Sequence, residues 1–334
     1  MIARNVAAGE RPAPPDYLGL ADVLSAAERL VGVAHRTPVI TSHALDQRVG
    51  GRLYLKAEML QRVGAFKFRG AFNAIASLDA STRARGVCSA SSGNHAQAVA
   101  LACALHGVQA TILMPVDAPR LKRAATEGYG AQVVTYDRYR EDREALLEAL
   151  AAQRGAEIVH PYDDPRVMAG QGTVAVELLD QAGALDVIAV PVGGGGLISG
   201  IATVIRTRCP SAWIVGVEPE ASDDVARSLA DGIRRRVAVA PTIADGQQTA
   251  TPGTRTWPVI QALVDEVVTV TDQEILSAMR TCFERLKLVV EPSGATALAA
   301  VLQGKVPTTD RRVGVVLSGG NADPAVFARA VTGG

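Results

Sequence analysis

Lys67 is the residue whose surroundings most suggest covalent chemistry. It lies in the segment Gly-Ala-Phe-Lys-Phe-Arg-Gly-Ala at 64–71, between two of the five phenylalanines of the chain. An amine must be uncharged to attack an aldehyde, and an apolar environment lowers the pKa of a lysine because it disfavours the charged form. The alternative is a lysine on a helix surface whose aliphatic stem lies along apolar neighbours. This segment alone allows both interpretations.

Four consecutive glycines at 193–196 follow the apolar run Val-Ile-Ala-Val-Pro-Val. Each glycine costs roughly 1 kcal/mol relative to alanine in a helix, so four in succession indicate a special backbone shape. Without Cβ atoms, successive N–H groups can surround an anion, and a helix that begins at Leu197 adds a favourable dipole. The run therefore predicts a phosphate site, although a tight strand-to-helix turn would explain one or two of the glycines.

Two familiar phosphate motifs do not fit this run. The chain has no GxxxxGK[ST] segment, and the third glycine of GxGxxG would fall on Ile198 or Ser199. An acidic residue, Glu218, follows about 20 residues on, as a dinucleotide site would require. A nicotinamide-binding oxidoreductase therefore stays open as an alternative of another class.

Small polar residues also end two other apolar runs. The segment Ser-Ser-Gly-Asn-His lies at 91–95, and Ser-Gly-Gly-Asn lies at 318–321. Hydroxyl groups and free backbone amides at strand ends bind carboxylates or phosphates, although simple helix capping would also explain them. Together with the glycine run, they predict one cleft beyond the carboxyl edge of a parallel sheet.

Strands that alternate with helices must position these segments. Short apolar runs rich in valine and isoleucine predict strands covered on both faces, at 87–92, 110–115, 132–136, 187–192, 213–218, 266–270 and 313–318. Helical patterns lie between them, at 95–106, 142–153, 167–181 and 274–286. The sequence Thr-Asp-Gln-Glu at 271–274 fits a capping box. The alternation predicts an α/β fold with right-handed crossovers.

Two polar stretches, 78–86 and 160–166, are candidates for domain crossings. The segment between them would form a small domain inserted into a larger one. The predicted parts are a flexible extension at 1–16, a large domain of 17–80 and 161–334, and a small domain of 81–160.

The composition excludes several classes of protein. Of the 334 residues, 48% are apolar, and the 34 basic residues balance the 34 acidic ones, which argues against nucleic acid or an anionic membrane as a partner. The four cysteines are scattered and form no CxxC pair, so a reducing, cytoplasmic location is the simplest expectation. The uncharged stretch 187–205 is long enough to cross a bilayer, but Pro191 and the glycines divide it, so we expect a buried element.

These motifs together resemble the fold-type II pyridoxal-phosphate enzymes, in the serine/threonine dehydratase and serine racemase group. The resemblance runs from about residue 20 to 323 and rests on HRTPV at 35–39, GAFKFRGA at 64–71, SSGNHAQA at 91–98, PVGGGG at 191–196, TIADG at 242–246, EPSGA at 291–295 and LSGGN at 317–321. It implies a tryptophan synthase β-like α/β fold with two open parallel-sheet domains and the cofactor between them.

The resemblance also implies roles for single residues. Lys67 would hold pyridoxal 5'-phosphate as a Schiff base and shuttle protons, with Phe66 packed beside the ring. Asn94 would hydrogen-bond the phenolic oxygen, and Ser318 would meet the pyridine nitrogen. The phosphate would rest on Gly193, Gly194, Gly195 and Gly196, and the substrate carboxylate would lie beside Ser91, Ser92 and His95.

The hydroxyl of Ser318 suggests a type of reaction. It cannot keep a proton on the pyridine nitrogen as a carboxylate would, so the ring is a weaker electron sink, which suits prompt loss of a β-substituent. The expected activity is β-elimination from L-threonine or L-serine, giving an α-keto acid and ammonia.

Ser92 keeps related activities open. Many plain dehydratases resembling this chain have alanine there, whereas serine racemases and threo-3-hydroxyaspartate dehydratases have a serine that can relay a proton on the opposite face of the cofactor. Ser92 is thus a second candidate catalytic residue, and both activities are alternatives. Arg143 is a candidate partner for a second substrate carboxylate, or else a solvated arginine on a helix surface.

The resemblance also suggests a metal and an assembly. The acidic segment at 218–224 is similar to one that binds Mg²⁺ or Ca²⁺ in the racemase branch, where Glu218, Asp224 and the carbonyl of Ser222 would be ligands. The alternative is a solvated acidic turn. The resemblance further implies a homodimer, and it leaves a small hydroxy-amino acid as the substrate.

Overall fold

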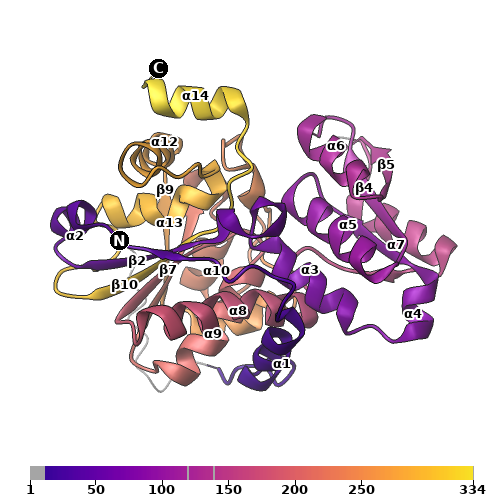
Figure 1. The fold of residues 1–334 in the computed structure, drawn as a ribbon, viewed down its shortest axis with the longest axis horizontal. Helices are drawn as coiled ribbons and strands as arrows, with labels where there is room; N and C mark the ends of the chain where they lie inside the picture. The colour runs from indigo at the N-terminus through magenta and orange to yellow at the C-terminus, as the bar shows by residue number, and fades with distance from the viewer. Residues whose placement is uncertain (1–11, 119, 138–139, 334) are drawn as a thin grey trace.

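The computed structural model describes residues 12–118, 120–137 and 140–333, which form two sheets with helices around them (Figure 1). The central strands of both sheets are short, apolar and mostly buried, as the valine- and isoleucine-rich runs predict, whereas the strands at the sheet edges are only partly buried. The predicted extension at 1–16 lies largely outside the described residues. The two sheets lie side by side in Figure 1, with α3 between them.

The larger sheet has six strands. All neighbouring pairs are parallel except the first, in which β1 runs antiparallel to β2. In spatial order the strands are β1 (Val39–Ile40), β2 (Arg52–Ala57), β10 (Arg312–Leu317), β7 (Val187–Pro191), β8 (Trp213–Pro219) and β9 (Glu266–Val270).

The smaller sheet has four strands, all of them parallel. In spatial order they are β5 (Gln132–Tyr136), β4 (Ala110–Pro115), β3 (Val87–Ala90) and β6 (Glu157–Ile158). These strands fall within the predicted small domain and those of the larger sheet fall outside it. The exact boundaries of the two domains stay a prediction.

Helices cover both faces of the larger sheet, so its strands are buried on both sides. One core includes Ile188 of β7 together with apolar residues of α1, α8, α9 and α11. The other includes the neighbouring Val187 and residues of α2, α12, α13 and α14. The α-helices are α1 (Leu20–Leu30), α2 (His43–Val49), α3 (Lys67–Ala76), α4 (Ala80–Arg85), α5 (Asn94–His106), α6 (Arg120–Gly128), α7 (Arg143–Arg154), α8 (Pro165–Ala182), α9 (Gly196–Arg208), α10 (Asp224–Asp231), α11 (Thr256–Leu263), α12 (Asp272–Thr281), α13 (Pro292–Leu302) and α14 (Pro324–Thr332).

The seven predicted strands and four predicted helices are all present, with ends that shift by a few residues. Thr271 and Glu274 form the predicted capping box at the start of α12. The predicted helix at 274–286 is shorter than expected, because α12 gives way to a π-helical turn (Cys282–Leu286) that ends at Lys287 with a φ of 60°.

The uncharged stretch at 187–205 is divided as expected into β7, the glycine loop and the first part of α9. In the described ranges, no helix combines the length and the apolar character that crossing a bilayer requires.

Candidate active site

The side chain of Lys67 lies in a cavity between the carboxyl ends of the two sheets. Lys67 is the first residue of α3, and its Nζ donates a hydrogen bond to the carbonyl oxygen of Pro161 at 2.8 Å. Burial lowers the pKa of this amine to about 8, although the carboxyl of Glu291 acts in the opposite direction. A useful fraction of the amine is therefore uncharged near neutral pH.

The two phenylalanines beside Lys67 have different environments. Phe66 lines the cavity, and its ring centroid lies 5.1 Å from the Lys67 Nζ. Phe68 points into the core, where it is fully buried and its ring packs against Phe72. Of the two phenylalanines that flank Lys67 in the sequence, only Phe66 therefore lies beside the amine in the cavity.

The glycine loop forms a second wall of the same cavity. A Cβ atom at Gly194 would lie 2.4 Å from the Tyr162 ring, and one at Gly196 would lie 2.9 Å from the Tyr162 Cα. Gly195 has a φ of +95° and comes directly before α9, so the loop leads into a helix N-terminus. The loop is a bare backbone surface of the kind that can hold a phosphate.

The segment 91–95 joins β3 to α5 and lines the cavity along its whole length. The Nε2 atom of His95 lies 3.2 Å from the carbonyl oxygen of Val159, and burial holds the pKa of this imidazole well below its usual value. The ring is therefore neutral, and a proton on Nε2 leaves Nδ1 as an acceptor. Nδ1 is buried and has no hydrogen-bond partner in the described part of the chain.

Ser318 follows β10 and closes the cavity from the larger sheet. Its side chain is buried, and its hydroxyl makes one long contact of 3.5 Å with the carbonyl oxygen of Ser293. The structure therefore brings together all the predicted cofactor and substrate residues: Phe66, Lys67, Ser91, Ser92, Asn94, His95, Gly193, Gly194, Gly195, Gly196 and Ser318.

Charged residues that sequence reasoning missed, or left as ambiguous, also line this cavity. Lys122 of α6 donates to Asp245 at 2.6 Å, which joins the two sheet units across the cavity. Glu291 accepts a hydrogen bond from the Asn94 side chain at 2.6 Å, and burial raises the pKa of this carboxyl to about 7. Arg143 lines the cavity as well, so it is not simply a solvated helix residue.

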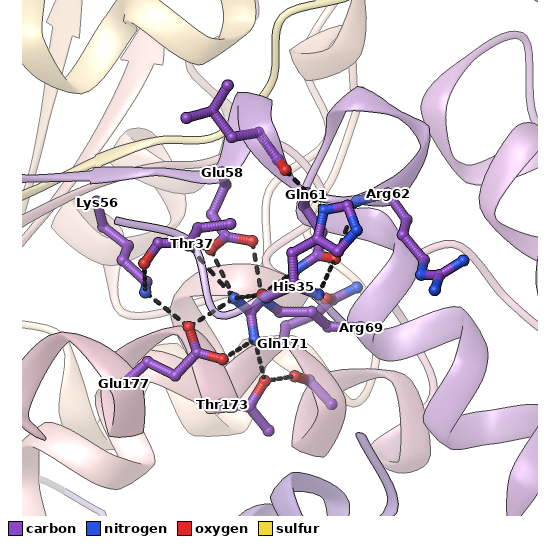
Figure 2. A network of polar contacts seen from close by, with 12 residues as sticks. His35, Thr37, Lys56, Glu58, Gln61, Arg62, Arg69, Gln171, Thr173 and Glu177 are labelled. Atoms are coloured by element: carbon purple, nitrogen blue, oxygen red, sulfur yellow. Dashed lines mark hydrogen bonds and ion pairs between the residues drawn. The ribbon is translucent and has the colours of Figure 1, made fainter. Parts of the chain in front are cut away.

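A network of buried charges lies on the other side of α3 (Figure 2). Arg69 is fully buried and forms ion pairs with Glu58 at 2.8 Å and Glu177 at 2.7 Å. Lys56 is also fully buried and pairs with Glu177 at 2.6 Å. Burial alone would lower the pKa of Arg69, but its two carboxylate partners raise it. This network fixes α3 and so the starting point of the Lys67 side chain.

In the acidic segment at 218–224, Glu218, Ser222 and Asp224 are fully buried, whereas Glu220 is exposed, so the segment is not simply a solvated turn. Both oxygens of Glu218 accept backbone N–H groups from the first turn of α10, at 3.1 and 2.8 Å. Burial raises the pKa of both carboxyls, that of Asp224 to about 7.

One oxygen of Asp224 accepts from the Thr249 hydroxyl at 3.1 Å, and Thr249 also lines the active-site cavity. The other, Oδ2, is buried without a partner in the described ranges. The set of two carboxylates and nearby carbonyls suits a hard cation. No group of three or more His, Cys, Asp or Glu side chains suited to a metal was found in these ranges.

Comparisons with known proteins agree with this geometry. Residues 32–319 match the family model described as "Pyridoxal-phosphate dependent enzyme". The L-threo-3-hydroxyaspartate ammonia-lyase of Saccharomyces cerevisiae is 48% identical over 93% of this chain and 96% of the relative. A serine racemase of Schizosaccharomyces pombe is 44% identical over 90% of this chain and 94% of the relative.

The solved structures agree as well. The crystal structure of serine racemase from Dictyostelium discoideum has a TM-score of 0.87 and 41% identity, and the match covers 92% of this chain and 99% of that one. The resemblance inferred from the motifs is confirmed, and the nicotinamide alternative loses its support. The chain belongs to the fold-type II pyridoxal-phosphate dependent enzymes, in the family of the serine/threonine dehydratases, serine racemases and hydroxyaspartate ammonia-lyases.

Proposed function

We propose that this protein is an ammonia-lyase for L-threo-3-hydroxyaspartate, which it converts to a four-carbon α-keto dicarboxylate and ammonia. The observation that carries the proposal is Arg143, because it lines the same cavity as Lys67. The second carboxylate of such a substrate can form an ion pair with the Arg143 guanidinium, whereas L-serine and L-threonine have no second carboxylate. The similarity to the yeast ammonia-lyase supports this substrate over the L-threonine or L-serine expected from the motifs.

The bound cofactor supplies an electron-withdrawing ring that stabilises negative charge at the substrate α-carbon. The residues that line the cavity fit this group, since the bare glycine loop suits its phosphate and Lys67 suits its aldehyde. The amine of Lys67, with a pKa of about 8, takes the α-proton. The β-hydroxyl then leaves as water, and hydrolysis of the released enamine uses one water and frees ammonia.

The Arg143 side chain forms an ion pair with the neighbouring Glu144 and stays partly exposed. Arg143 is the first residue of α7, and its Nε donates to the Glu144 carboxylate at 2.9 Å. Asp142 caps the helix by accepting the backbone N–H groups of Glu144 and Ala145. The Arg143 side chain is 39% exposed, so a substrate can reach the guanidinium.

Replacement of Arg143 by methionine tests the choice of substrate. We expect kcat/KM for L-threo-3-hydroxyaspartate to fall about 100-fold, while kcat/KM for L-serine changes less than about 3-fold, because only the former loses a charged partner. The measurement is keto-acid release from both substrates and from L-threonine. Arg140→Met is the matched control, since Arg140 lies nearby with its side chain 85% exposed. Equal losses on all substrates would refute the proposed specificity.

Racemisation is a second candidate activity, favoured by Ser92. Ser92 lines the same cavity as Lys67, so its hydroxyl can serve as a second proton carrier, and a serine racemase is among the similar proteins. We expect Ser92→Ala to lower the formation of D-serine from L-serine by about 100-fold and to leave keto-acid release within about 3-fold. Chiral chromatography of the products measures both, and equal losses would exclude a separate proton carrier.

We also propose that Glu218, Asp224 and the carbonyl oxygen of Ser222 bind Mg²⁺ or Ca²⁺. The Oδ2 atom of Asp224, which is buried and has no hydrogen-bond partner among the described residues, supports this site. We expect EDTA to lower the melting temperature and Mg²⁺ to restore it, because a cation that binds only the folded state stabilises it. Asp224→Asn should remove this response, and a wild-type protein with no response to EDTA or added cation would refute the site.

A further inference from the structure

Glu291 is a buried carboxyl in the active-site cavity to which the reaction above gives no role. It is 3% exposed and lies at the N-cap of α13, in the unit of the larger sheet. Its Oε1 accepts a hydrogen bond of 2.6 Å from the side-chain nitrogen of Asn94, which begins α5 in the other unit. The contact joins residues 197 positions apart.

The Asn94 amide is held from its other end as well. Asn321 donates its side-chain N–H to the Asn94 oxygen at 2.9 Å and to the carbonyl oxygen of Val63 at 2.7 Å. Asn94 thus uses its oxygen and one of its two N–H groups within the protein. A primary amide has two N–H donors, so one remains for a group in the cavity.

The backbone after Ser318 is shaped around the Glu291 carboxyl. A Cβ atom at Gly319 would lie only 2.1 Å from the Glu291 Oε1. The absence of a side chain at 319 therefore leaves the space in which the carboxyl meets Asn94. Lys67, Lys122 and Asp245 are the other charged groups that face Glu291.

We propose that Glu291 is a positioning residue that acts through Asn94. It holds the Asn94 amide with its nitrogen toward the cavity, so that the remaining N–H donates to the phenolic oxygen of the cofactor. Without this acceptor, only the hydrogen bond from Asn321 opposes a turned-over amide, which would present its own oxygen to that anionic group. The proposal rests on the cofactor shared by the family and is independent of the substrate.

The hydrogen bond does not require a charge on Glu291. Burial raises the pKa of this carboxyl to about 7, and either protonation state keeps an oxygen that accepts from Asn94. A glutamine at 291 also offers such an oxygen in the same place. Glu291→Gln therefore keeps the positioning contact, whereas Glu291→Ala removes it.

The absorption spectrum of the holoenzyme tests the proposal without any substrate. An N–H donor stabilises a phenolate and lowers its pKa. We expect Glu291→Ala to raise the pH midpoint of the visible cofactor band by about one unit and to weaken cofactor affinity about tenfold, as the loss of one hydrogen bond implies. Glu291→Gln should stay close to the wild type in both. Glu274→Gln, at a capping box outside the cavity lining, is the control for the same substitution at a partly buried glutamate.

A double-mutant cycle with Asn94→Ala tests whether Glu291 acts through Asn94 or directly on the cofactor. We expect Glu291→Ala to change neither the midpoint nor the affinity further once Asn94 is removed. Additive effects, an unshifted spectrum in Glu291→Ala, or a glutamine variant as impaired as the alanine variant would each overturn the proposal. Glu291→Met, which fills the space without an acceptor, replaces Glu291→Ala if that variant does not fold.

Discussion

Two cations on the first turn of α3, only two residues apart, lie in opposite electrostatic environments. Lys67 faces the cavity with one carbonyl as its hydrogen-bond acceptor, and burial lowers the pKa of its amine to about 8. Arg69 faces the other way into the network of Figure 2, where Glu58 and Glu177 raise the pKa of its guanidinium. The same helix thus carries Lys67, whose charged form is destabilised by burial, and Arg69, whose charged form is stabilised by two carboxylate partners.

The difference shows that the partners of a buried cation decide whether it serves as a reactive group or as part of the structural core. A buried charge with matched, hydrogen-bonded partners keeps its proton, and its loss leaves those partners uncompensated. A buried amine without a carboxylate in contact gives up its proton more readily, which suits a nucleophile and base. The network around Arg69 then supplies the rigidity that Lys67 requires, because it fixes the helix that carries both.

Replacement of Lys67 gives the largest expected effect on activity. We expect Lys67→Ala to reduce keto-acid release more than about 1,000-fold, because no other residue combines the nucleophile with the base. The fold should persist, as far-UV circular dichroism will show. Borohydride reduction of the wild-type holoprotein should label position 67, and label at another lysine would contradict the assignment.

Replacement of Arg69 gives the largest expected effect on stability. We expect Arg69→Met to lower the free energy of unfolding by about 3–5 kcal/mol, because Glu58 and Glu177 lose their buried partner. Arg69→Lys, which keeps the charge, should lose less. Urea denaturation of the apoproteins measures both, and a loss of less than about 1 kcal/mol in the methionine variant would show that the network is not structural.

The smallest expected effect concerns the pH dependence of stability. The pKa of Lys67 is lower in the folded protein, about 8, than its ordinary value of 10.5, so between these values the unfolded chain binds more protons. The free energy of unfolding of the apoprotein should therefore gain a contribution on the order of 2 kcal/mol from this group as pH rises from 8 to 10.5. Subtracting the pH profile of Lys67→Ala isolates it. A difference that is flat across this range would show that the amine is not destabilised.

Much of the fold and of the cofactor site could be predicted from the sequence, because local patterns carry them. Apolar runs identify the central strands, and the glycine run, which lines the cavity, predicts a phosphate site through its own composition. The sequence did not reveal β2, whose segment Arg-Leu-Tyr-Leu-Lys-Ala contains a lysine that reads as exposed. Lys56 is buried there because Thr37, Glu177 and Gln181 accept its hydrogen bonds, and Glu177 lies 121 residues away in the sequence.

Glu291 escaped prediction for the same physical reason. A glutamate before a proline is typical of an ordinary helix start. The role proposed for Glu291 depends on its contact with Asn94, which lies in another unit of the fold. The acidic turn was ambiguous because composition does not distinguish a solvated carboxylate from a buried one. Such residues depend on long-range contacts, which a single sequence does not display.

The close contacts around the glycine loop limit which substitutions are tolerated at residues 193–196. Added Cβ atoms at the four positions would lie between 2.4 and 3.1 Å from atoms of Gln247, Tyr162 and Ile260. At Gly193 and Gly196 the nearest atom belongs to the backbone, which cannot move aside as a flexible side chain can. Nearly every amino-acid change within these twelve consecutive nucleotides should therefore be lost from a library selected for growth, whereas silent changes survive. In deep mutational scanning, we expect almost no surviving substitutions at these four positions and more surviving substitutions at the positions on either side.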